Sequence, residues 1–444
     1  MADKINNFQE LINKAKVVLV ANRQQLYTVP SKGLYPHQVL WDGCFVAIGL
    51  SHIELDQAKS EIGRLLSAQW QNGMIPHIVF TEGPHYWWDR RIWRSWVSPL
   101  APKKIATSGV SQPPMLAEAI VAIGKQLSDL DKIAWYKSVF LQMVAYHQWL
   151  VRERDPKGEG LVVQLHPWEI ALDTTPPCIA QVREEALPLW IRFLEVTNLE
   201  KIGDHFRVDT KYVQSKGQRS SNIESLALYN LLRKIRSSKY DSSKILSRPA
   251  FAVQDITYNS IFIRANSLLL EVAKDINEAL PRELLDFSAK AATSIDKFWD
   301  QQDCQYYSRE FVSGKLIKEP SIGALLPLYS GAISASRAEQ LVKTLSDRDS
   351  FNLNYPVPSV PANSQWFNST RYWQGPTWIN TNWLIISGLR RYGFDDQADT
   401  LTKSTLKLVQ KSGFYEYFDP ISGQPSGVNN FSWTAALVID LAST

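Results

Sequence analysis

The apolar positions of this chain recur with the period of an α-helix from one end to the other. In residues 4–26, the apolar side chains that share one face of a predicted helix are Ile5, Phe8, Leu11, Ile12, Ala15, Val18 and Leu19. Similar stripes predict helices near residues 40–52, 55–70, 112–127, 130–154, 180–197, 221–237, 254–276, 281–299, 335–346, 377–392, 395–411 and 431–442. Alternation of apolar and polar residues, which is typical of strands, is confined to residues 161–165 and 304–318. The pattern predicts an all-α protein of about a dozen helices.

No linker divides this helical pattern. Turn signals such as Asp155-Pro156-Lys157-Gly158 separate the stripes, and the polar residues 238–249 are interpreted as one loop. We therefore expect a single domain over residues 1–444, built as an (α/α)6 toroid of six inner and six outer helices, with long loops at one rim forming the site. A helical solenoid is the structural alternative, but no repeat of fixed period is visible.

Composition excludes several classes of partner. The net charge of +4 is small for 444 residues and gives no basis for nucleic-acid binding. Three separated cysteines, Cys44, Cys178 and Cys304, indicate reduced thiols. The polar N-terminus lacks the apolar stretch of a signal peptide, and no apolar run approaches the ~20 residues of a membrane helix. We expect a cytoplasmic protein without a membrane partner, whose oligomeric state, homo-oligomer included, stays open.

Aromatic residues are abundant for a helical core. The chain has 16 Trp beside 17 Tyr and 17 Phe. Indole rings stack well on the apolar faces of sugars, and their N–H groups still find partners. A tryptophan-rich core is the alternative interpretation, and composition alone does not decide between the two.

Five segments combine Trp, Gly, Pro and carboxylates. They are residues 34–45, 108–114, 166–176, 371–378 and 414–420, the last followed by 431–434. Hydrolysis of a glycosidic bond needs one carboxylic acid that protonates the leaving oxygen, and an inverting enzyme needs a second carboxylate that activates water. Asp173 follows an apolar run and precedes Thr-Thr-Pro-Pro, a setting that keeps an acid protonated. Glu416 lies among aromatic residues, where a carboxylate is costly without a partner or a function.

Two of these segments, and other aromatic and histidine residues, also have a plainer interpretation. Trp41-Asp42 could begin a helix, with Asp42 as its cap and Trp41 in the core. Tyr372, Trp373 and Trp378 could belong to the core. The histidines show no metal-ligand spacing, so we predict neither a metal nor another cofactor. Residues 84–104, which include Tyr86 and several Trp and Arg residues, are either a surface loop or a lid over the leaving-group side.

Together the five segments resemble glycoside hydrolase family 63, most closely its short branch that acts on mannosylglycerate and glucosylglycerate. The likeness runs from Tyr35 to Trp433 through WDGCF, SGVSQPP, HPWE, RYWQGPTW, FYEYFDP and FSWTAAL, in the family's order. It implies an (α/α)6 toroid and an inverting α-glycosidase. The family's general acid matches Asp173 and its general base matches Glu416.

The resemblance also implies a set of sugar-binding residues. These are Tyr35, Trp41, Asp42, Tyr86, Gln112, Trp168, Arg207, Tyr372, Trp373, Gly375 and Trp378. The sequence departs from the family at Gly43, where serine is common, and at Ile170-Ala171-Leu172 before the acid. Neither departure removes a catalytic group, but both leave the substrate open.

Several functions remain to be distinguished. The expected substrate is a small α-glucoside or α-mannoside, glucosylglycerate or mannosylglycerate foremost. A neutral α-glucosidase or trehalase-like enzyme is the alternative within the class. A sugar epimerase or lyase would rely on paired His or on Tyr and Arg, and no convincing His pair is present. A non-catalytic sugar-binding toroid is disfavoured by the intact carboxylates at both motif positions.

Overall fold

Six helices form a closed inner ring. The computed structural model describes residues 2–83, 86–183, 188, 191 and 209–444. Each inner helix packs on the next, and the last packs on the first. In ring order they are α2 (Leu40–Ser51), α5 (Leu116–Lys125), α12 (Ile256–Asp275), α14 (Pro327–Ser330), α16 (Ile379–Arg391) and α18 (Ser432–Ser443).

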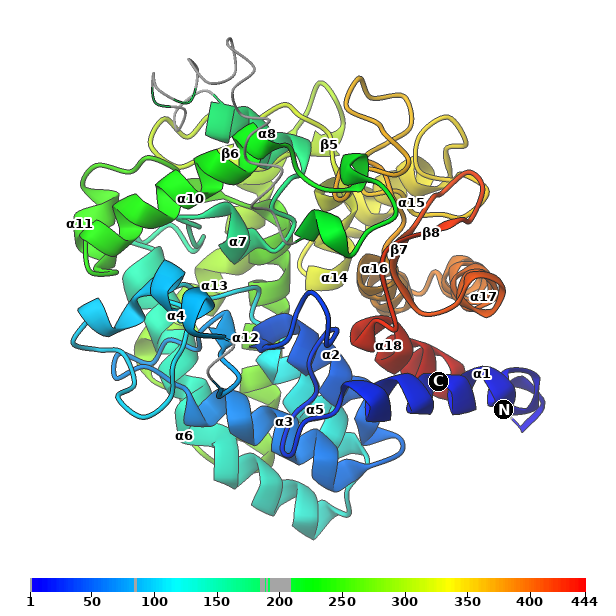
Figure 1. The fold of residues 1–444 in the computed structure, drawn as a ribbon, viewed down its shortest axis with the longest axis horizontal. Coiled ribbons are helices and arrows are strands. Elements are labelled where there is room, and N and C mark those ends of the chain that lie inside the picture. Colours follow the sequence, from blue (N-terminus) through cyan, green and yellow to red (C-terminus); the bar gives the residue numbers. More distant parts are fainter. Residues whose placement is uncertain (1, 84–85, 184–187, 189–190, 192–208) are drawn as a thin grey trace.

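Six further helices cover the outside of this ring and alternate with the inner helices along the chain. They are α1 (Ala2–Asn22), α3 (Leu55–Ser67), α6 (Asp129–Arg154), α13 (Arg282–Ser294), α15 (Ala335–Ser346) and α17 (Asp395–Ser412). α1 packs on α18, and Figure 1 shows the two side by side with both ends of the chain next to them. This arrangement is the predicted (α/α)6 toroid, and the all-α fold class is confirmed.

Burial explains the two layers. All twelve residues of α2 are buried, so this helix is apolar on every side and can only lie inside the ring. α3 buries one face, through residues such as Ile62 and Leu65, and its other face is polar. Close approach between inner helices requires small residues. A Cβ atom at Gly49 of α2 would lie 2.3 Å from the Ala436 carbonyl oxygen of α18.

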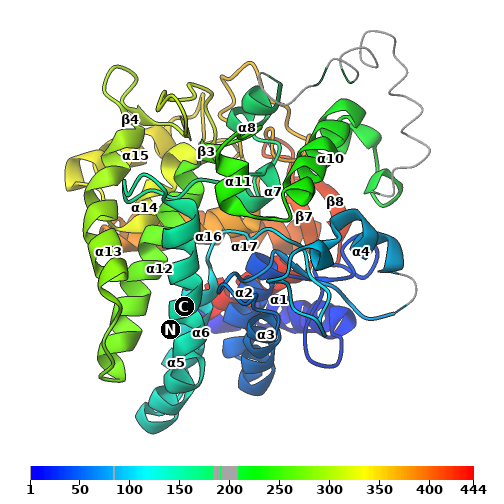
Figure 2. The ribbon, with the colours of Figure 1, turned by 90° about the vertical axis from the view of Figure 1, so that its left-hand side faces the viewer.

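The remaining elements belong mainly to the connections. The short helices are α4 (Trp87–Trp93), α7 (Pro167–Ile170), α8 (Pro176–Gln181) and α11 (Ser242–Leu246), and α10 (Asn222–Ser237) is longer. In Figure 2, α7, α8 and α10 lie toward the upper end of the molecule, while α3, α5 and α6 extend to the lower end. The candidate active site uses residues from these upper connections.

Four antiparallel two-stranded sheets are present in the described residues. They pair β1 (Gln38–Val39) with β2 (Ile78–Val79), β3 (Val253–Gln254) with β6 (Arg309–Glu310), β4 (Trp299–Asp300) with β5 (Gln305–Tyr306), and β7 (Tyr415–Phe418) with β8 (Pro425–Asn429). None of the described helices combines the length and apolar character needed to cross a membrane.

The sequence pattern and the structure differ in a few segments. Residues 238–249, expected as a loop, contain the helix α11 (Ser242–Leu246), which Asp241 caps through a bond from the Lys244 amide. Residues 161–165, expected as a strand, form only a single bridge from Gln164 to Val253. Most of the helix expected at 180–197 lies outside the described residues. The sequence shows no one-sided apolar pattern for the inner helix α14, because this helix is short and buried on all sides.

Candidate active site

A cavity of about 450 Å³ opens where several inner helices begin. Trp41 and Asp42 line it from the first turn of α2, and Trp433 from the first turn of α18. Gln112 precedes α5 and Tyr372 precedes α16, and both also line the cavity. The ring of helices therefore supplies a rigid base, and the connections between helices supply the side chains.

Asp173 lies on one side of this cavity, just after the short helix α7. His166 caps α7 by accepting a bond from the Trp168 amide at 3.1 Å, and Ala171, at a φ of 65°, ends the helix. The buried Arg154 of α6 donates to Glu169 at 2.7 Å, which fixes α7 to the outer layer. These contacts determine where the Asp173 side chain enters the cavity.

The Asp173 carboxyl has an environment that favours its protonated form. Its Oδ1 atom is buried and has no hydrogen-bond partner among the described residues. Burial raises the pKa of Asp173 to about 7, although Arg219 opposes the shift. A carboxylic acid that holds its proton near neutral pH can donate that proton to a leaving group.

Glu416 has the opposite environment on strand β7. It is buried, and its Oε1 accepts from the Tyr35 hydroxyl at 2.9 Å and from Arg219 Nη1 at 3.1 Å. Its Oε2 accepts from Arg219 Nη2 at 2.5 Å and from the Val428 amide at 3.1 Å. Four hydrogen bonds thus converge on the Glu416 carboxyl, two of them from the Arg219 guanidinium as a bidentate ion pair, and such an oxygen-rich acceptor can take a proton from water.

Arg219 is a site residue that sequence reasoning did not identify. Its guanidinium also donates to the Tyr35 hydroxyl at 2.9 Å and lies 4.9 Å from the centre of the Tyr372 ring. The signal next to it is the Ser221–Glu224 capping box that begins α10, which places Arg219 just before a helix. That signal predicts the helix start and gives no indication of the distant carboxylate.

Two stacked indoles form one wall. Trp373 lines the cavity, and its ring lies 3.6 Å from the ring of Trp378 at an interplanar angle of 10°. Trp378 is fully buried behind it. Gly375 holds the loop at a φ of 154°, where a Cβ would lie 2.3 Å from the Asn368 carbonyl oxygen. Trp378 and Gly375 therefore support Trp373 from behind and do not line the cavity.

Asp42 is also buried on this wall, and burial raises its pKa to about 8. It does not cap α2, because the N-cap position is Val39 and no side chain bonds there. Gln112 Oε1 instead accepts from the Trp41 amide at 3.3 Å. Asp42 is thus left facing the cavity.

Most of the predicted site residues meet in this one cavity. Those that line it are Tyr35, Trp41, Asp42, Gln112, Trp168, Asp173, Tyr372, Trp373 and Glu416. Tyr86 does not line it and packs its ring against His37 at 4.9 Å. Arg207 lies outside the described residues.

The segment 84–104 contributes Trp93 to the cavity lining, where Tyr86 was expected. Trp93 of α4 is buried, lines the cavity and lies 5.4 Å from the Trp168 ring. The arginines of this segment do not line it. Arg90 donates to the Thr81 carbonyl at 2.9 Å, Arg91 lies over Trp87 at 4.3 Å, and Arg94 donates to the Arg91 carbonyl at 3.2 Å.

Comparison with known proteins identifies the family. Residues 35–434 match the family described as the mannosylglycerate hydrolase MGH1-like glycoside hydrolase domain. The chain is 36% identical over 442 residues to a mannosylglycerate hydrolase of Rubrobacter radiotolerans, covering 98% of this chain and 97% of that protein. The chain belongs to this family of glycoside hydrolases. The predicted resemblance and the predicted activity class, hydrolysis of a glycosidic bond, are confirmed.

Two further relatives extend the comparison. A glucosylglycerate hydrolase of Mycolicibacterium hassiacum is 28% identical over 446 residues, with 97% of each chain covered. The structure of the GH63 mannosylglycerate hydrolase from Thermus thermophilus, in complex with Tris and D-glycerate, superposes with a TM-score of 0.86 at 33% identity, covering 97% of this chain and 99% of that one. Relatives named for two different sugars thus align with nearly the whole of this chain.

The raised pKa of Asp173 leads to a prediction about stability. The unfolded group titrates near pH 3.9, so wild-type protein loses stability as the pH rises from about 4 to 7, where the buried group must ionise. Asp173→Asn cannot ionise. Its free energy of unfolding should exceed that of wild type by a margin that grows over this range to about 1–2 kcal/mol, since the open cavity weakens the full effect.

Urea unfolding at a series of pH values measures this margin. Asp349→Asn, which removes an exposed carboxyl far along the chain, is the matched control and should follow wild type. A margin for Asp173→Asn that is constant between pH 4 and pH 8 would contradict the raised pKa.

Proposed function

We propose that this glycoside hydrolase cleaves the α-glycosidic bond of a hexosylglycerate with inversion, using Asp173 as general acid and Glu416 as general base. One observation carries the proposal. Two carboxyl groups line the same cavity in opposite environments, one with a buried unpartnered oxygen and a pKa of about 7, the other held by four donors. Environments that differ in this way separate an acid from a base.

The proposed steps follow from these environments. Asp173 donates its proton to the glycosidic oxygen as the bond to the anomeric carbon breaks. Glu416 accepts a proton from a water molecule whose oxygen attacks that carbon from the opposite face. This geometry requires carboxyl groups roughly 6.5–9.5 Å apart, which leaves room for the water. After product release, the two groups exchange their protons with solvent.

The cavity walls suit one hexose ring. Trp373 and Trp41 offer aromatic faces, and the two rings lie 6.4 Å apart at 48°. Asp42 and Gln112 offer polar oxygens on the same wall. Stacking on an indole and hydrogen bonds to a carboxyl group offset the free-energy cost of removing a sugar from water. We assign Tyr35, Trp168 and Tyr372 to the same proposed subsite.

The proposed aglycone is glycerate. Support comes from the relatives named mannosylglycerate and glucosylglycerate hydrolases and from the Thermus structure in complex with D-glycerate. Arg219 is the sole cationic side chain that lines the cavity within the described residues, and Glu416 already pairs with it. A second cation is needed to offset the desolvation of the glycerate carboxylate, and the family resemblance makes Arg207 the candidate.

We further propose a single catalytic domain over residues 1–444, with 84–104 as a lid, in a cytoplasmic enzyme. Support for one domain comes from a single buried cluster that extends from Leu11 of α1 to Ala442 of α18. Support for a reducing compartment comes from the cysteines, all three of which are free. Trp93 joins the lid segment to the cavity wall.

The two catalytic roles can be separated with an α-glycosyl fluoride, because fluoride leaves without full protonation. Asp173→Asn should lower kcat for the glycerate glycoside by about 10²–10⁴-fold and should lower kcat for the fluoride far less. Glu416→Gln should lower both, because both reactions need an activated water.

Thermal unfolding shows whether each variant is folded before its rates are compared. Equal losses on the two substrates for Asp173→Asn would remove Asp173 as the acid. Loss of fluoride hydrolysis only in that variant would reverse the two roles.

The choice of aglycone is tested with a glycerate glycoside and the matching glycerol glycoside. Arg207→Gln should raise KM for the glycerate compound at least tenfold more than for the glycerol compound, because only the first carries a carboxylate. Arg94→Gln, whose side chain donates to its own helix, is the matched control and should change neither KM. If wild-type enzyme does not distinguish the two aglycones, the enzyme is better described as an α-glucosidase of neutral sugars.

A further inference from the structure

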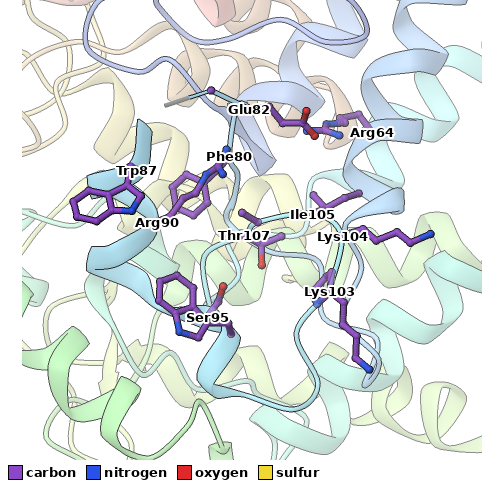
Figure 3. Close-up of a pocket in the computed structure, with 14 residues that line it drawn as sticks. Arg64, Phe80, Glu82, Trp87, Arg90, Ser95, Lys103, Lys104, Ile105 and Thr107 are labelled. Carbon is purple, nitrogen blue, oxygen red and sulfur yellow. The ribbon is translucent and has the colours of Figure 1, made fainter. Parts of the chain in front are cut away.

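A second cavity, of about 560 Å³, lies beside the candidate active site and shares no lining residue with it. Figure 3 shows its lining, which comes from α3, from residues near 80, from α4 and the turn after it, and from residues 102–107. The helix α4 separates the two cavities. It contributes Trp87 and Arg90 to the second cavity and Trp93 to the first.

The second cavity is strongly cationic. Among the described residues of its lining, Arg64, Arg90, Lys103 and Lys104 are basic, and Glu82 is the one carboxylate. These five residues leave a formal charge of 4 − 1 = +3. None of the four basic groups forms an ion pair with a carboxylate of the described chain. A concentration of unpaired positive charge raises the local concentration of anions.

Two of the guanidinium groups each have one N–H donor without a hydrogen-bond acceptor among the described residues. The Nε atoms of Arg64 and Arg90 are buried and have no hydrogen-bond acceptor within the described structure. Arg90 uses only Nη2, to the Thr81 carbonyl, and Arg64 lies over the Tyr27 ring at 5.2 Å. A buried donor without an acceptor is costly, so each such atom calls for an explanation. Because these Nε atoms are buried, an anion in the cavity would instead meet the outer Nη atoms of the same guanidinium groups.

The aromatic residues of the lining indicate what carries the anionic group. Trp87 and Trp96 are 47% and 59% exposed, which is unusual for large apolar rings. Arg91 lies over one face of the Trp87 ring at 4.3 Å, and the remaining exposed surface of this ring and of Trp96 can cover the apolar face of a small polyol or sugar. The charge favours phosphate over carboxylate, because a phosphate monoester carries about −1.5 to −2 near neutral pH and three strong acceptor oxygens.

From this lining we infer that the second cavity is a binding site for a small phosphate monoester, such as a phosphorylated sugar. The phosphate lies among the guanidinium and ammonium groups, and the organic part lies against the exposed indoles. Glu82 opposes the ligand and limits its affinity. The site requires neither Asp173 nor Glu416, although part of its lining, including Trp87, Arg90 and Lys104, belongs to the segment 84–104 proposed above as a lid.

Isothermal titration of the full-length protein with glucose 6-phosphate tests this inference. Unphosphorylated glucose, with NaCl at matched ionic strength, is the ligand control. Arg64→Gln and Lys104→Gln should each weaken glucose 6-phosphate binding about tenfold, and Glu82→Gln should tighten it. Lys403→Gln changes an exposed lysine on α17, on the opposite side of the molecule from α4 in Figure 1, and should leave the affinity unchanged.

Glycoside hydrolysis without phosphate should be unchanged in the Arg64 and Glu82 variants, which shows that they are folded. For Lys104→Gln, which lies in the proposed lid, thermal unfolding shows that the variant is folded. Absence of binding to wild type overturns the inference. So does binding that is equal in wild type, Arg64→Gln and Lys104→Gln, because the ligand then lies elsewhere, or binding that NaCl at the same ionic strength abolishes. Failure of the catalytic predictions for Asp173 and Glu416 would leave these titrations unaffected.

Discussion

The buried ion pair between Arg219 and Glu416 fixes the geometry on which the candidate site depends. The two side chains are 3% and 2% exposed, and burial of two charges is favourable only with close, bidentate contact and additional donors. Tyr35 and the Val428 amide supply those donors. The pair joins the segment before β1, the start of α10 and strand β7. Removal of either partner would leave an uncompensated charge in the cavity wall.

This pair also explains how Asp173 and Glu416, two of the carboxyl groups that line the cavity, can differ in their chemistry. Glu416 forms the ion pair with Arg219 and also accepts hydrogen bonds from Tyr35 and the Val428 amide. Burial is the largest influence on the pKa of Asp173 and favours its neutral form. A backbone hydrogen bond and the charge of Arg219 lower this pKa by less, and the charges of Glu224 and Glu416 raise it. The two carboxyl groups can therefore act as acid and base because more hydrogen-bond donors lie around Glu416 than around Asp173.

Sequence reasoning predicted those features whose signal is local. Stripes with one apolar face predicted the outer helices, and motif segments predicted the cavity residues that begin α2 and precede α16. The inner helix α14 has no polar face, so it carried no periodic signal. Arg219 is one of 48 basic residues and lies 197 positions from Glu416, so only the fold brings them together. Periodicity also cannot tell Trp373, which lines the cavity, from Trp378, which supports it.

The stereochemistry of hydrolysis tests the central claim most directly. If water held by Glu416 attacks the face opposite the bond that Asp173 protonates, the configuration at the anomeric carbon inverts. Proton NMR of wild-type enzyme acting on an α-linked glycerate glycoside, recorded before mutarotation, should show the β-anomer of the free sugar first. Initial release of the α-anomer would mean retention, and Glu416 could not then act as a base toward water in the first step.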